Sequence, residues 1–181
     1  MNLREMSPWR VTSWICTGAL AVSLLTCIAI AATRSLGLTA VTVTALDPAK
    51  EPVDHVVPLI KRHEALPDYE LTILLRNGDT IRLGTKPDTS AAGGLEWRIE
   101  EPVCVADIAS LRLTEQDKVV SDALAEIQVS GESFTENGYR FDFQTERSFA
   151  VGVHSFYKTP IGMAILGGVF VAVALIVLSN L

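Results

Sequence analysis

The sequence predicts a mainly β protein, in which one antiparallel β-sandwich of about eight strands lies between an N-terminal and a C-terminal transmembrane α-helix. Two runs without a charged residue, residues 11–32 and 161–178, are long enough to cross a bilayer. Between them, short apolar segments alternate with turn residues at intervals of about 8–12 residues. No amphipathic helical pattern separates these segments, and such spacing is typical of antiparallel sandwiches.

Composition and charge limit the classes of function. The chain has 181 residues and a mean hydropathy of +0.32, which is high for a protein with 20% charged residues. The apolar excess lies in the two end runs, and the stretch between them has the usual size of one domain. Residues 35–160 contain 12 Lys and Arg against 20 Asp and Glu, a net charge of −8. This acidic balance argues against binding to nucleic acid or to anionic lipid.

The N-terminal run predicts a first transmembrane helix at residues 11–33, after a tail at residues 1–10. Arg4 and Arg10 precede the run, and Trp9 and Trp14 lie where interfacial aromatic residues are enriched. A cleaved signal peptide is the alternative, because a basic start, an apolar run and small residues at 29–31 also satisfy that pattern.

The C-terminal run predicts a second transmembrane helix at residues 161–179. Because cytoplasmic flanks carry an excess of Lys and Arg, Arg4 and Arg10 place the N-terminal tail in the cytoplasm. The domain at residues 36–157 is then extracytoplasmic, which means periplasmic in a bacterium, and the C-terminus is cytoplasmic. We therefore expect a multi-pass membrane protein whose partners are the lipid bilayer and other membrane-protein subunits.

Small residues recur every four positions in both predicted helices. They are Ala19, Ser23, Cys27 and Ala31 in the first helix, and Ala164, Gly168 and Ala172 in the second. Small residues at this spacing let helix backbones approach closely, so they predict packing between the two helices or against a partner subunit. The alternative is that small residues are simply common in such helices.

The first half of the domain contains one strand and one irregular connection. Residues 38–45 alternate β-branched and small side chains and predict a strand, which Asp47 and Pro48 end. Residues 51–68 contain three prolines and predict an irregular connection with a short helix around 59–64. His55 and His63 lie in this connection without a pattern that would complete a metal site, so they are interpreted as surface residues.

The second half of the domain is predicted as a succession of strands. Residues 69–76 and 80–86 form a hairpin, because Asn77-Gly78 supplies the positive φ angles that a tight turn needs. A loop rich in small residues follows at 87–94. Further strands are predicted at residues 95–105, 108–113, 123–129, 139–145 and 148–156.

One acidic stretch carries a family resemblance. Glu115 and Asp117 lie at i, i+2 at the end of a predicted strand, and Asp122 precedes the next one. With the Trp-containing segment 95–99 before it, this stretch resembles the calcium-loop segment of C2 domains. The resemblance implies a C2-like sandwich in which Glu115, Asp117 and Asp122 take the positions of Ca²⁺ ligands.

The acidic stretch also departs from the C2 pattern. Ala125 occupies the usual Gly position, and the second calcium loop of the family has no counterpart in this sequence. Because Ca²⁺ takes about 6–8 oxygen ligands, the alternative is a solvated acidic loop in a calcium-free C2-like fold.

No arrangement typical of catalysis is recognisable. Cys104 is the domain's only thiol and is interpreted as a small buried residue, and neither a nucleophile–base pattern nor a phosphate-binding glycine loop occurs. We therefore expect a non-enzymatic, membrane-anchored interaction or structural protein without a cofactor, an accessory or stabilising subunit of a larger membrane complex. The alternative hypothesis is an extracytoplasmic domain that senses Ca²⁺ or another ligand and relays the signal to the helices.

Overall fold

The computed structural model of the protein describes residues 8–52, 66–116, 121–129 and 131–179. The chain divides into two compact units. The β domain runs from Leu36 to Arg147, and the helical unit consists of the chain up to Ser35 and from Ser148 onward. The two apolar ends of the sequence thus form one unit, although more than a hundred residues of domain separate them.

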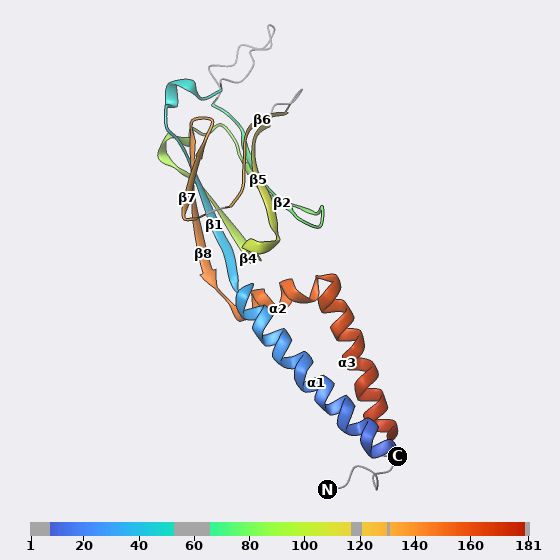
Figure 1. Cartoon of the computed structure of the whole chain (residues 1–181). Coiled ribbons are helices and arrows are strands. Elements are labelled where there is room, and N and C mark those ends of the chain that lie inside the picture. The colour runs from blue at the N-terminus through green and yellow to red at the C-terminus, as the bar shows by residue number, and fades with distance from the viewer. Residues whose placement is uncertain (1–7, 53–65, 117–120, 130, 180–181) are drawn as a thin grey trace. The chain divides into compact units, whose positions relative to one another are not determined.

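The β domain consists of two four-stranded antiparallel sheets, which confirms the predicted sandwich class (Figure 1). The first sheet has the order β4-β1-β8-β7 and the second the order β3-β2-β5-β6. The first sheet contains β1 (Leu36–Ala45), β4 (Leu95–Cys104), β7 (Ser133–Glu136) and β8 (Tyr139–Arg147). The second contains β2 (Tyr69–Leu75), β3 (Thr80–Lys86), β5 (Ile108–Gln116) and β6 (Ser121–Ile127). Short 3-10 helices lie in the connections: η2 (Pro48–Lys50), η3 (Ala91–Gly93) and η4 (Val105–Asp107).

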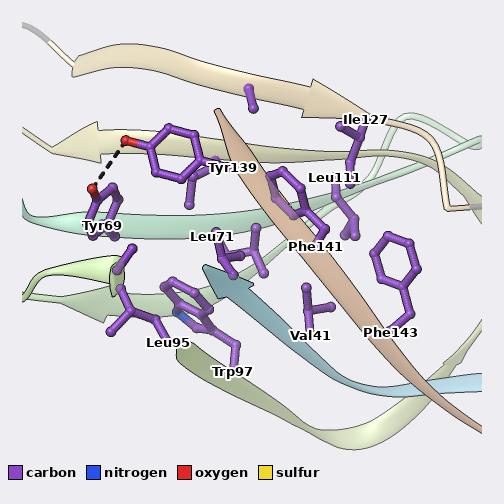
Figure 2. Packing of buried hydrophobic residues seen from close by; sticks show 14 of the residues in the cluster. Val41, Tyr69, Leu71, Leu95, Trp97, Leu111, Ile127, Tyr139, Phe141 and Phe143 are labelled. Atoms are coloured by element: carbon purple, nitrogen blue, oxygen red, sulfur yellow. Dashed lines mark hydrogen bonds between the residues drawn. The ribbon is translucent and has the colours of Figure 1, made fainter. Parts of the chain in front are cut away.

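The core between the sheets follows the two-residue period of the strands. In β1, Val41 and Val43 are fully buried, whereas Thr42 and Thr44 are only partly buried, because successive side chains of a strand point to opposite faces. Figure 2 shows the largest side chains of this core, contributed by both sheets. Among them are Tyr69, Leu71, Trp97, Leu111, Tyr139, Phe141 and Phe143.

Two Asn-Gly pairs make turns of different kinds. Between β7 and β8, Asn137 and Gly138 both adopt positive φ angles, 49° and 82°, as a two-residue hairpin turn requires. Between β2 and β3 only Gly78 does so, with φ 92°, and the Asn77 side chain instead accepts a hydrogen bond from the Asp79 amide. The predicted hairpin is confirmed. Of the two positive φ angles expected at Asn77-Gly78, the structure has only the one at Gly78.

One predicted strand is wrong, and one strand has no counterpart in the prediction. Residues 148–156 were expected to be a strand, but Phe149–Tyr157 forms the helix α2. Its buried residues, Gly152, Ser155 and Phe156, follow the helical i, i+3, i+4 spacing and not the alternation of a strand. The eighth strand of the structure is β7, which was not predicted from the sequence. This strand is short and none of its side chains is buried, so its sequence lacks the alternating apolar pattern of a strand.

The helical unit contains α1 (Pro8–Thr33), α2 and α3 (Pro160–Ser179). Both α1 and α3 are long and apolar enough to span a membrane, which agrees with the two predicted spans. In the most apolar 18-residue stretch of each helix, only 11% of the residues of α1 and 6% of those of α3 are buried within the chain. Neither helix is therefore the core helix of a globular unit. In Figure 1, α2 lies between the end of α1 that leads into β1 and the start of α3.

Candidate functional site

The chain enters and leaves the β domain at one place. In the domain, Leu36 at the start of β1 is the register partner of Arg147 at the end of β8. In the helical unit, the Ser148 amide donates to the Ser35 carbonyl at 2.7 Å. Only Arg34 and Ser35 separate α1 from β1, and only Ser148 separates β8 from α2. The two connections thus lie side by side and contain almost no free chain.

The helical unit holds α2 through close contacts with the last turns of α1. A Cβ added at Gly152 would lie 2.0 Å from the Ala31 carbonyl oxygen, so only glycine fits there. The Arg34 Nε donates to the Ser155 hydroxyl at 2.7 Å, and the Cys27 thiol lies 3.5 Å from the Tyr157 hydroxyl.

The predicted small-residue positions in α1 and α3 differ in their surroundings. Cys27, Ala31 and Ala172 are buried within the chain. Ser23 is half-buried, and Ala19, Ala164 and Gly168 are exposed. A Cβ at Gly168 would meet no atom within 4 Å, so Gly168 makes no close helix contact with the residues that the structure describes. Packing of Gly168 against a partner subunit stays a prediction.

The two calcium-loop residues that the structure describes are neighbours across β5 and β6 but differ in burial. Glu115 is buried with 6% of its surface exposed, whereas its register partner Asp122 on β6 is exposed. Asp117 lies outside the described residues, as do His55 and His63. Within the part of the chain that the structure describes, no three His, Cys, Asp or Glu side chains are grouped as a metal site would require. Ca²⁺ binding therefore stays a prediction.

Glu126, the other acidic side chain near this stretch, is occupied by protein donors. It accepts hydrogen bonds from the Ser110 hydroxyl at 2.7 Å and from the Arg112 guanidinium at 2.9 Å. The Ser110 bond and then the Arg112 bond lower the pKa of this exposed carboxyl. Glu126 thus ties β6 to β5.

A polar cluster lies at one end of the sandwich core. We call it the tyrosine–glutamate cluster, and its members are Glu51, Tyr69, Ser90, Glu115 and Tyr139. The two tyrosine hydroxyls lie 3.2 Å apart and the rings meet edge to face, as Figure 2 shows. Since Tyr69 is on β2 and Tyr139 on β8, this pair joins the two sheets.

The Glu51 carboxylate organises the cluster. It accepts from the Tyr69 hydroxyl at 2.9 Å, from the Ser90 hydroxyl at 2.7 Å and from the Ala91 amide at 2.9 Å. Burial first, and then the bonds to Tyr139 and Glu51, raise the pKa of Tyr69. Burial also raises the pKa of Tyr139, and the negative charges of Glu51 and Glu115 act in the same direction.

Residues at both ends of the connection between β1 and β2 form hydrogen bonds with the loop at residues 88–91. Glu51 binds Ser90 and Ala91, while the Asp68 carboxylate accepts from the Asp88 amide at 2.7 Å and the Pro67 carbonyl from the Thr89 amide at 3.2 Å. These bonds thus fasten both ends of the connection between β1 and β2 to the loop at residues 88–91.

Sequence reasoning missed this cluster because its members are far apart along the chain. Glu51 lies 18 residues before Tyr69, and Tyr139 follows Tyr69 by 70 residues. The available signal was the placement of Tyr69 and Tyr139 at strand starts, where a tyrosine body can join the core and its hydroxyl can find a partner at the edge.

Cys104 is buried, as the sequence indicated, with 4% of its surface exposed. His154 is exposed on α2 in the helical unit.

The comparisons add no family to this description. The sequence matches no model of a known protein family, and no curated protein matches it. The sandwich architecture is therefore consistent with the C2 resemblance, but no family match supports that identity.

Proposed function

We propose that this chain is a two-pass membrane protein whose β-sandwich serves as a non-catalytic accessory or stabilising subunit of a larger membrane complex. In this proposal α1 and α3 cross the bilayer, both termini are cytoplasmic, and a C2-like domain lies on the extracytoplasmic side.

The supporting observation is the pair of short connections between α1 and β1 and between β8 and α2. Leu36 and Arg147 are register partners, and one to two residues separate each from its helix. A domain attached by long flexible linkers can search a large volume, whereas one attached this closely is confined to the membrane surface. Such a domain is suited to bracing a neighbouring membrane protein and poorly suited to capturing a distant soluble ligand.

Surface chemistry favours the same role. On the outer faces of the strands, charged side chains are paired with one another, as in Arg112 with Glu126, Arg98 with Glu96 and Arg140 with Asp142. Within the tyrosine–glutamate cluster, the Glu51 carboxylate and the two tyrosine hydroxyls are likewise bound to one another. Exposed ion pairs of this kind are common on solvated protein surfaces.

The orientation is tested by cysteine labelling in intact cells. Cys16, Cys27 and Cys104 are replaced, and a single cysteine is introduced at the exposed Glu132 of the domain. An impermeant maleimide should label Glu132→Cys before the cells are opened, and a reporter fused after Leu181 should become accessible only afterwards. Labelling in the reverse order would place the domain in the cytoplasm.

The accessory role is tested by native purification. Mild detergent extraction from native membranes should recover a membrane protein in fixed stoichiometry with the tagged chain. As a matched control, a variant keeps α1, α3 and the topology but lacks residues 36–147, and it should lose that protein if the domain carries the interaction. A monodisperse monomer from native membranes would overturn the accessory role.

A further inference from the structure

The short helix α2 lies beside the part of α1 that would be inside the bilayer. Its Gly152 contacts the backbone at Ala31, and its Tyr157 contacts the side chain of Cys27. Ala31 and Cys27 both belong to the charge-free run at residues 11–32. At ~1.5 Å of rise per residue, they lie about 3 Å and 9 Å before the end of α1 at Thr33.

These contacts give α2 a defined depth if α1 spans a membrane. The polar interfacial layer on each side of a bilayer is about 5–8 Å thick around a hydrocarbon core of roughly 30 Å. A helix that touches α1 at Ala31 and Cys27 therefore lies at the boundary between headgroups and acyl chains. This is the depth at which interfacial amphipathic helices bind, with the apolar face buried by about 5–10 Å.

The exposed side chains of α2 are suited to that environment. Phe149 is 53% exposed, and Ala150 is exposed as well. Val151 and Val153 are half-buried, and residues 149–157 contain no Asp, Glu, Lys or Arg. A helix on the surface of a water-soluble domain carries charged residues on its outer side, whereas the only ionisable side chain that α2 exposes is His154.

The polar groups of α2 are found toward the end of the helix. The Ser155 hydroxyl accepts a hydrogen bond from Arg34, which directly follows α1, and Lys158 directly follows α2. Basic side chains at this level can extend their charged ends into the headgroups while their carbon chains remain in the apolar layer.

We propose that α2 is an interfacial helix, and that the lipid of the extracytoplasmic leaflet covers its outer side, continuous with the apolar outer surfaces of α1 and α3. The chain would then have three membrane elements: two spans and one helix in the plane of the interface. The inference rests on the proposed membrane insertion of α1 and α3 but not on the accessory role.

Spin labelling of the full chain in lipid nanodiscs tests this inference. In a background with Cys16→Ala, Cys27→Ser and Cys104→Ala, single cysteines are placed at Phe149 and Ala150 on α2. Control labels are placed at Leu24, which is 62% exposed in the middle of α1, and at Glu132 in the domain. Circular dichroism confirms that each variant folds.

Accessibility of each label to oxygen, which partitions into lipid, is compared with accessibility to a water-soluble nickel chelate. The ratio at Phe149→Cys and Ala150→Cys should be several-fold higher than at Glu132→Cys and lower than at Leu24→Cys. The inference would be overturned if the labels on α2 gave the same ratio as Glu132→Cys, or if they were shielded from both reagents. In that case a lipid-like ratio at Leu24→Cys would show that the membrane spans are still correct. A water-like ratio at Leu24→Cys would instead overturn the spans themselves, and the inference with them.

Discussion

Glu51 holds together parts of the β domain that lie far apart in the sequence. It binds Tyr69 of one sheet and the loop residues Ser90 and Ala91 at the same time. Glutamate suits this position because an ionised carboxylate only accepts hydrogen bonds and offers two oxygens for several donors.

Replacing Glu51 with Gln should therefore destabilise the β domain. The amide nitrogen of Gln cannot accept, so at least one of the three donors loses its partner, at a cost of about 1–3 kcal/mol. Urea unfolding of the fragment 36–147, followed by the fluorescence of Trp97, measures the effect. Glu132→Gln, the same change at an exposed position, is the matched control. Equal midpoints for the two variants would contradict the role given to Glu51.

The two buried tyrosines should make the domain sensitive to alkaline pH. Folding raises the pKa of Tyr69 and of Tyr139, so at high pH the unfolded chain releases these protons more readily than the folded domain. The stability they contribute is complete below the unfolded tyrosine pKa of about 10 and falls as the pH rises above it.

This pH dependence can be assigned to the pair by substitution. Above about pH 10, the free energy of unfolding of the fragment 36–147 should fall steeply as the pH rises. In the variant with Tyr69→Phe and Tyr139→Phe the fall should be much shallower, because neither ring then carries an ionisable hydroxyl. Parallel curves for the two proteins would show that other groups cause alkaline unfolding.

At the scale of elements, the helices and strands that could be predicted are those with a long charge-free run or a regular alternation of apolar side chains. The spans and seven of the eight predicted strands match helices or strands of the structure, since charge-free runs and alternation leave few other solutions. The segment at 149–157 was misassigned because valine and phenylalanine have high strand propensity. Its helical form depends on Gly152 fitting against Ala31 and on the burial of Phe156, which no local pattern shows.

Gly152 and Gly168 should respond in opposite directions to the same substitution. Alanine in a helix interior is favoured over glycine by about 1 kcal/mol, so Gly168→Ala, in open space, should stabilise α3 slightly. Gly152→Ala should instead separate α2 from α1, because its Cβ would overlap the Ala31 carbonyl. Thermal melting of the helical circular dichroism signal in detergent measures both. A shift to higher temperature for Gly152→Ala would contradict the contact between α1 and α2.

At the scale of the whole molecule, the class of fold follows from the sequence, whereas the boundary between its two units does not. The domain was expected to extend to residue 157, whereas the compact unit that contains both sheets ends at Arg147. The difference concerns ten residues whose apolar side chains suit a sandwich core and a membrane helix equally well. Only the register of β8 against β1, complete at Leu36 and Arg147, shows that the sheet ends there.

The two boundaries predict different behaviour for two fragments. Fragment 36–147 contains both complete sheets, so it should be a soluble monomer that unfolds cooperatively and does not float with liposomes. Fragment 36–157 adds α2 without α1, and so exposes the side chains of Phe149 and Phe156 together; it should associate with liposomes or with itself. In the matched control, fragment 36–157 with Phe149→Ser and Phe156→Ser should regain the behaviour of the shorter fragment. Liposome flotation and gel filtration distinguish these outcomes.

If fragment 36–157 were monomeric, failed to float and were more stable than fragment 36–147, residues 148–157 would complete the sandwich, and the sequence-based boundary would be the correct one.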